Sequence, residues 1–200
     1  MNKSPELCRS CERITNNFEV LRGKYPTYHN MPVRGRGDLD SKVCIVGLAP
    51  GLHGANKTGE TFTGDFCSKI LFQCLVNADF YTKDSRPLFY LTNAMKCLPP
   101  NNKPKTSELN QCRQYLKNEL DSMRNLRSIV ALGVNAHNSI IKCYHKKVDE
   151  LRFAHATKHR LGDYVLYDSY HCSKINIQTG RLLKKSLTDI LSRVKNETYD

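Results

Sequence analysis

Cysteine is the residue with the clearest chemical potential in this sequence, which contains nine cysteines in 200 residues. Cys8 and Cys11 form a C-x-x-C pair in a polar tail beside Arg9 and Arg13, a setting unlike a hydrophobic core. Thiolates at this spacing bind soft metal centres such as zinc or iron–sulfur clusters. Because the start lacks the apolar segment of a signal peptide, we expect an intracellular protein, cytoplasmic (nucleoid) or nuclear, with few disulfides.

A glycine-rich stretch, GLAPGLHGANKTGETFTGD at residues 47–65, follows the apolar run 43–46. Its five glycines predict an irregular loop in which the backbone can approach a ligand closely. From Gly51 the letters GLHGANKT miss the phosphate-loop pattern G-x-x-x-x-G-K-[ST] only at Asn56. A phosphate loop must run directly into a helix that faces the phosphates, whereas more loop follows Lys57. Nucleotide hydrolysis is therefore the weaker interpretation.

Three polar side chains stand at the ends of apolar segments, where acid–base or hydrogen-bonding chemistry is possible. Asp65 closes the glycine-rich loop, Asn93 follows the strand-like LFYLT, and His171 follows YVLYDSY. From position alone Asn93 is equally suited to a turn or a helix cap, and Asp65 to capping the helix that follows it. The spacing leaves both interpretations open.

The elements that must position these residues alternate between strands and helices. Apolar runs predict four buried strands, at residues 43–48, 88–92, 128–132 and 164–167. Apolar residues three and four apart predict helices at 66–78 with Asp65 as cap, at 107–125 with a Thr or Ser cap, at 134–144, and from a cap at Thr179 to residue 194.

This alternation predicts an α/β fold, namely a three-layer α/β/α sandwich around a mainly parallel, four-stranded central sheet. Residues 1–200 are expected to form a single domain, with residues 1–40 as an irregular wrap. Ligands of such a sheet bind beyond the carboxyl ends of its strands. The loops that matter are therefore 47–65, 93–106, 133–136 and 168–179.

The charge balance points to a polyanionic partner. Lysine and arginine number 31 against 19 aspartates and glutamates, a formal net charge of +12. Such an excess favours salt-sensitive binding to phosphates, with nucleic acid as the first candidate and a membrane surface as the second. No apolar run approaches the roughly 20 residues that span a bilayer. We expect no membrane partner and a monomeric protein.

Three segments resemble the motifs of the uracil-DNA glycosylase superfamily: GLAPGLHGANKTGETFTGD, TNAMKCLPPNNKPKTSELNQC at 92–112, and YHCSKINIQTGRL at 170–182. The first is similar to family 5, since Leu48 stands where family 4 has an acidic residue. The resemblance implies a uracil-DNA glycosylase-like fold and a monofunctional enzyme. Such an enzyme flips uracil out of DNA, hydrolyses its N-glycosidic bond and starts base excision repair. The apolar Leu48 also implies a broader range that includes hypoxanthine and xanthine. The alternative is a non-catalytic zinc- or Fe–S-containing nucleic-acid-binding protein.

The resemblance also implies roles for individual residues. The amide of Asn93 reads the edge of the base, and the ring of Phe62 stacks on it. His171 donates to the base oxygen as negative charge develops, while Asp65 positions or polarises the attacking water. Because Leu48 cannot polarise water, Asp65 carries more of the mechanism than in family 4. The other expected substrate contacts are Gly47, Leu48, Ala49, Gly51, His53, Asn56, Gly64, Ser173 and Asn176.

Four cysteines match the positions that hold a [4Fe–4S] cluster in families 4 and 5, although their spacing alone suits zinc equally: Cys8, Cys11, Cys97 and Cys112. The remaining cysteines on apolar segments are predicted to be core: Cys44, Cys67, Cys74 and Cys143. The chain departs from the family at Cys172, where proline is usual, and this leaves the loop that carries His171 freer. Lys174 or Ile175 is expected to fill the gap left by the flipped base.

Overall fold

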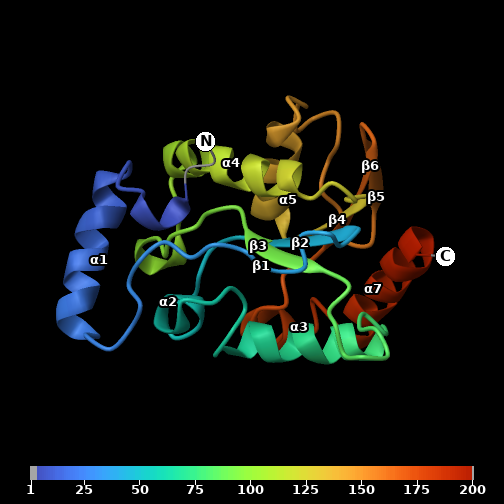
Figure 1. Ribbon diagram of the computed structural model, residues 1–200, viewed down its shortest axis with the longest axis horizontal. Helices are drawn as coiled ribbons and strands as arrows, with labels where there is room; N and C mark the ends of the chain where they lie inside the picture. Colours follow the sequence, from blue (N-terminus) through green and yellow to red (C-terminus); the bar gives the residue numbers. More distant parts are fainter. Residues whose placement is uncertain (1–3, 200) are drawn as a thin grey trace.

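The computed structural model describes residues 4–199 and contains a six-stranded sheet in the order β1-β3-β2-β4-β6-β5 (Figure 1). Its strands are β1 (Arg36–Gly37), β2 (Val43–Gly47), β3 (Tyr90–Asn93), β4 (Ser128–Leu132), β5 (Lys158–Leu161) and β6 (Tyr164–Ser169). Strands β3, β2, β4 and β6 run parallel, which confirms the predicted four-stranded centre. Strands β1 and β5 add antiparallel edges that were not predicted.

Helices cover both faces of this sheet, as a three-layer sandwich requires. Helices α3 (Phe66–Asn77) and α7 (Lys184–Tyr199) lie on one face, and α4 (Thr106–Ser122) and α5 (Val134–Cys143) on the other (Figure 1). Strand β2 is fully buried because alternate residues serve the two layers. Val43 and Ile45 belong to the α3/α7 core, whereas Cys44 and Val46 belong to the α4/α5 core.

The N-terminal segment is more regular than expected. It contains the short 3-10 helix η1 (Pro5–Leu7) and the 13-residue helix α1 (Glu12–Lys24), so the prediction of an irregular wrap at 1–40 is wrong. Ile14, Phe18 and Leu21 form a narrow apolar stripe that packs on residues such as Met95 and Tyr115. Most other residues of α1 are polar, and Val20 is an exposed apolar residue outside the stripe, so the sequence pattern of this helix is weak.

The short helices correct several expected boundaries. Residues 47–65 contain one helical turn, α2 (Ala55–Thr58), and 3-10 helix η2 (Pro100–Asn102) interrupts the loop after β3. Thr179 does not cap the last helix, because it ends α6 (Lys174–Gln178), and α7 begins only at Lys184. Helix α4 is capped at Lys105 rather than by Thr or Ser, and the Glu108 carboxylate accepts the Lys105 N–H at 2.7 Å. In residues 4–199 no helix has the length and apolar character needed to cross a bilayer.

Candidate active site and thiolate centre

The loops that follow the four parallel strands enclose one cleft of about 660 Å³. All four predicted loop regions contribute to its lining. This size lies within the range typical of small-molecule sites. The predicted residues that line the cleft are Leu48, Ala49, Gly51, Phe62, Asp65, Asn93, His171, Ser173 and Asn176.

Gly47 brings Asn93 and Phe62 together at the floor of this cleft. Gly47 and Asn93 are register partners at the ends of β2 and β3. A Cβ on Gly47 would lie 2.6 Å from Asn93 Oδ1 and 2.7 Å from Phe62 Cζ, closer than real Cβ contacts allow. Phe62 is 8% exposed and has φ +54°, a left-handed conformation that is rare for a bulky residue. The loop thus holds an aromatic ring beside a side-chain amide.

A buried ion pair, which the sequence reasoning missed, supports Asn93 from behind. The Lys96 side chain is 1% exposed. Its ammonium donates to Thr92 Oγ1 at 2.5 Å, to the Asn93 carbonyl at 2.9 Å and to Glu119 Oε2 at 2.5 Å. Glu119 Oε1 in turn accepts the Gly35 N–H at 3.0 Å. Every proton of the ammonium therefore has an acceptor, and one of those acceptors fixes the backbone of Asn93. The sequence offered one indication of this buried ion pair: a lysine among small or apolar residues in the segment NAMKC at 93–97.

The two carboxylate oxygens of Asp65 have different environments. Oδ1 accepts the Ser68 N–H and the Ser68 hydroxyl, each at 2.9 Å, so Asp65 caps α3 as predicted. Among residues 4–199, Oδ2 has no hydrogen-bond partner, and it lies against Gly51 and Gly54, where a Cβ on either glycine would crowd it. Capping therefore leaves one oxygen of this cleft-lining carboxylate free for another contact.

The loop that carries His171 is fixed by its own side chains. Asn176 Nδ2 donates to the His171 carbonyl at 2.8 Å, and Ser173 caps α6 by accepting the Asn176 N–H at 3.3 Å. Gly133, directly after β4, has φ +96°, a left-handed conformation that favours glycine, and it lies beside His171. These contacts place the imidazole in the lining of the same cleft as Asp65 and Asn93.

Four predicted substrate contacts lie outside the cleft lining. His53 is exposed on the outer side of its loop and hydrogen bonds through Nδ1 to the Tyr28 hydroxyl at 3.0 Å. Asn56 is fully buried, and its amide donates to Asn30 Oδ1 at 2.8 Å. Gly64 has a left-handed backbone conformation with φ +77°. Gly47 lies against the side chains of Asn93 and Phe62. The placement of these residues supports a role in shaping the loop.

Further residues line the cleft that were not predicted, among them Phe153, Tyr170 and Arg181. The Arg181 guanidinium lies 4.5 Å from the centre of the Tyr170 ring, and the His155 ring stacks on Tyr170 at 4.8 Å. His155 Nδ1 accepts the Tyr170 N–H at 3.2 Å, and its Nε2 bonds to the Ser186 hydroxyl at 2.7 Å. Burial lowers the pKa of His155. A neutral imidazole therefore sets the position of the residue immediately before His171.

A buried carboxylate anchors the segment that supplies Phe153. Asp168 Oδ1 lies 2.7 Å from His137 Nδ1, and Asp168 Oδ2 lies 3.0 Å from His159 Nε2 and accepts the Ala154 N–H at 3.3 Å. His137 Nε2 bonds to the Leu151 carbonyl at 2.7 Å. These hydrogen bonds join α5, β5, β6 and the 150s loop, so this cluster has its polar atoms engaged within the protein.

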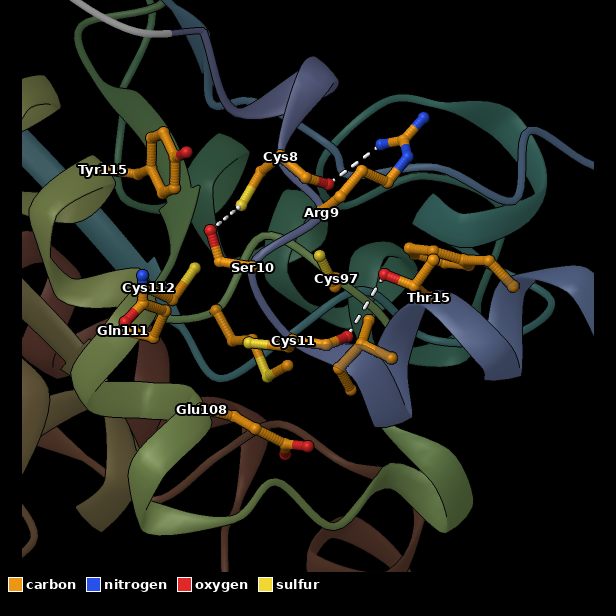
Figure 2. Close-up of a pocket in the computed structure, with 13 residues that line it drawn as sticks. Cys8, Arg9, Ser10, Cys11, Thr15, Cys97, Glu108, Gln111, Cys112 and Tyr115 are labelled. Carbon is orange, nitrogen blue, oxygen red and sulfur yellow. Dashed lines mark hydrogen bonds between the residues drawn. The ribbon is translucent and has the colours of Figure 1, made fainter.

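The four predicted metal-ligating cysteines line a second, smaller cavity. Figure 2 shows the sulfur atoms of Cys8, Cys11, Cys97 and Cys112 facing a common space, which is a cavity of about 20 Å³. They come from the tail after η1, the start of α1, the loop after β3, and α4. All are free thiols. The four cysteines therefore bring the start of α1 next to α4 and the loop after β3.

The chemistry of this donor set fits a soft metal centre. Burial raises the pKa of the Cys112 thiol to about 11, and burial followed by repulsion from the other sulfurs raises the pKa of Cys97 well above its ordinary value. Metal binding requires the thiols to ionise, and a cation at this position would balance the charge of the resulting thiolates. The Lys96 N–H donates to Cys112 Sγ at 3.2 Å, the type of contact that surrounds metal-bound sulfur. A two-pronged ion pair from Arg13 to Glu108, with distances of 2.8 and 2.7 Å, holds α1 on α4 beside the cavity.

Of the cysteines predicted to be core, Cys44, Cys74 and Cys143 are buried. Cys67 is not, because it lies in the first turn of α3 and lines the cleft. Helical periodicity places Cys67 near the apolar stripe but cannot reveal that the first turn of α3 projects beyond the sheet.

Together these observations define the class of protein: an α/β/α sandwich with a ligand cleft at the carboxyl ends of its parallel strands and a separate four-cysteine centre. The family model described as the Uracil DNA glycosylase superfamily matches residues 34–195. The chain belongs to the uracil-DNA glycosylase superfamily.

Curated relatives agree with this assignment, and a solved structure shares the fold. A Type-5 uracil-DNA glycosylase of Pyrobaculum aerophilum is 34% identical over 199 residues, covering 93% of this chain and 87% of the relative. A Type-5 enzyme of Thermus thermophilus is 34% identical over 202 residues, covering 94% and 92%. The crystal structure of wild-type SMUG2 from Pedobacter heparinus shares the fold, with a TM-score of 0.51 and 15% identity over 96% of this chain and 86% of that chain.

Proposed function

We propose that this protein is a monofunctional DNA glycosylase that flips uracil out of DNA and hydrolyses its N-glycosidic bond, starting base excision repair. Membership of the superfamily and similarity to Type-5 uracil-DNA glycosylases support this activity. The observation that carries the proposal is the pairing of Asn93 with Phe62 across Gly47, in one cleft with Asp65 and His171.

Recognition of the base follows from this pairing. A flipped base loses its stacking in the duplex, and the ring of Phe62 offers a replacement face. The Asn93 amide has both a donor and an acceptor, which complement the N–H and carbonyl of uracil. The support of the Asn93 backbone by Lys96 reduces the freedom of this amide before the base arrives.

Cleavage separates charge, leaving an electron-rich base and an electron-poor sugar. The His171 imidazole is suited to donate to the base oxygen as its negative charge grows. The free Oδ2 of Asp65 is suited to orient a water and to offset positive charge on the sugar, while Oδ1 keeps the carboxylate fixed by capping α3.

DNA is the partner that this scheme requires. The net charge of +12 favours attraction to the phosphate backbone. Next to the His171 loop, Ile175 on α6 has 68% of its surface exposed, so its apolar side chain is accessible to a partner. Of the two candidates named from sequence, we favour Ile175 over Lys174 for filling the gap left by the flipped base, because apolar wedges replace lost stacking.

We also propose a [4Fe–4S] cluster, in preference to zinc, at Cys8, Cys11, Cys97 and Cys112. When bound, it would supply structural cross-linking rather than chemistry at the base, because the cysteines line a cavity separate from the cleft. Metal analysis and a broad absorption near roughly 400 nm distinguish iron from zinc. Cys97→Ser should lose the metal, whereas Cys143→Ser, at a buried cysteine outside the centre, should retain it.

The test of function is base release from oligonucleotides that contain uracil, hypoxanthine or xanthine, in single and double strands and without ATP. We expect release of uracil by the natural protein. The apolar Leu48 in the lining supports release of the two purines as well. Asn93→Ala should abolish uracil release and retain DNA binding. DNA binding by the natural protein without release of any base would instead establish the non-catalytic alternative.

A further inference from the structure

Two cysteines outside the metal centre, Cys67 and Cys172, form a pair beside the cleft. The Cys172 thiol donates a hydrogen bond to the Cys67 carbonyl, with a sulfur-to-oxygen distance of 3.5 Å. The two residues come from the first turn of α3 and the loop after β6. Their side chains therefore meet between the segment capped by Asp65 and the segment that carries His171.

Access to the two sulfurs is unequal. Cys67 is half-buried and lines the cleft, so a small molecule in the cleft can reach it. Cys172 is 0% exposed and is covered by the α3/α7 core. A reagent in solution can therefore reach Cys172 only after reacting with Cys67.

The electrostatics favour Cys67 as the reactive member. Hydrogen bonds from Cys172 and from His171 lower the pKa of the Cys67 thiol, although burial opposes this shift. Donation to Cys67 raises the pKa of Cys172. Cys67 also lies in the first turn of the 12-residue helix α3, where backbone N–H groups stabilise a thiolate.

We propose that Cys67 and Cys172 are a thiol-oxidation site, in which Cys67 attacks a small disulfide such as oxidised glutathione and Cys172 resolves the product. The Cys67 thiolate attacks one sulfur, the glutathione S–S bond breaks, and one glutathione thiolate leaves. Cys172 gives its proton to a departing thiolate and attacks Cys67 Sγ, which releases the second glutathione. Two cysteine thiols are oxidised and one glutathione disulfide is reduced to two thiols.

The consequence is a covalent link between α3 and the His171 loop. The link consumes the Cys67 thiolate and draws the two sulfurs to the short separation of a disulfide. Proline at position 172, usual in the family, cannot form this link, so the site is specific to chains with cysteine there. The inference does not depend on the proposed glycosylase activity.

The experiment uses the whole protein, purified without oxygen so that bound metal is retained. Oxidised glutathione is added near neutral pH, free thiols are blocked with iodoacetamide, and peptides are analysed by mass spectrometry. We expect a Cys67–Cys172 disulfide in the natural protein. In Cys172→Ser the reaction should stop with one glutathione on Cys67, and in Cys67→Ser no adduct should form at Cys172. Before oxidation, iodoacetamide should modify Cys67 at least about tenfold faster than Cys172.

A matched control separates this pair from its neighbour on the same helix. Cys74 is 1% exposed and lies near Cys172, so Cys74→Ala tests whether it takes part. Cys74→Ala should form the Cys67–Cys172 link at the natural rate. Absence of the glutathione adduct in Cys172→Ser, equal alkylation of the two cysteines, or a link from Cys74 to Cys172 would overturn the proposal. Each readout is a mass or a rate of thiol modification, so a failure here is distinct from a lack of base release.

Discussion

Gly47 and Asn93 face each other at the ends of two parallel strands, and the Asn93 amide occupies space that any side chain on residue 47 would take. The same space borders the tip of the Phe62 ring. Gly47→Ala should therefore displace both groups and reduce base release at least about 100-fold, because misplacement of binding groups by 1 Å has effects of this size. Measurement of single-turnover release from uracil-containing DNA checks this.

A glycine elsewhere provides the control for that change. Gly23 lies in α1, and a Cβ there would meet no atom within 4 Å. Gly23→Ala should leave base release unchanged and stabilise α1 by up to about 1 kcal/mol. Equal activity of the Gly47 and Gly23 variants would show that the Asn93–Phe62 arrangement is unimportant.

Substitutions of Asp65 can separate its two roles. Asparagine is a good helix cap, so Asp65→Asn should retain the bond from the Ser68 N–H to Oδ1 but lose the charge on the other side. We expect the free energy of unfolding to change by less than about 0.5 kcal/mol while base release falls strongly. Asp65→Ala should lose activity and, in addition, about 1 kcal/mol of stability. Full activity of Asp65→Asn in a base-release assay would exclude a role for the carboxylate charge.

The ion pair behind Asn93 predicts a large stability effect. Glu119→Gln leaves the Lys96 ammonium buried without its anionic partner. This change should lower the free energy of unfolding, measured with urea, by about 3–5 kcal/mol. Asp121→Asn, which removes an exposed ion pair with Lys117 on the same helix, should cost less than about 1 kcal/mol. Similar decreases in the free energy of unfolding of both variants would contradict a larger contribution from the buried ion pair of Lys96.

His155 predicts a pH dependence of stability. Burial lowers its pKa in the folded protein, so the unfolded chain takes up a proton first as the pH falls. The stabilisation that the neutral His155 ring provides is therefore fully present above about pH 6.5, the ordinary pKa of histidine. This stabilisation is lost as the pH falls toward the lowered pKa of His155 in the folded protein. His155→Gln should flatten this part of the profile, since its amide oxygen can accept the Tyr170 N–H at any pH. The free energy of unfolding between neutral and mildly acidic pH checks this, and identical slopes for the two proteins would contradict it.

The part of the fold that could be predicted from sequence is the part that is buried on both sides. The runs at β2 and β4 are almost entirely apolar, with Ser128 as the polar exception, because helices cover both faces of the sheet. Strand β1 has only two residues and β5 has the sequence KHRL, so neither edge carries an apolar pattern. Pairing with an existing strand forms them, and this tertiary effect is invisible in local sequence.

The candidate site shows a similar division. Motifs identified Phe62, Asn93 and His171, and all three line the cleft. The motifs could not reveal that His53 and Asn56 lie outside the cleft lining, because their partners Tyr28 and Asn30 come from a distant part of the sequence. The pairing of Lys96 with Glu119 was equally hidden, since the partner lies 23 residues further along the chain.

The packing of α1 has a consequence for the order of assembly during synthesis. Its apolar stripe rests on Met95, Leu98 and Tyr115, and Arg13 reaches Glu108. Helix α1 is therefore synthesised before its docking surface, which is complete only after residue 115 has been made. The segment that carries Cys8 and Cys11 must therefore remain undocked until translation has passed residue 115.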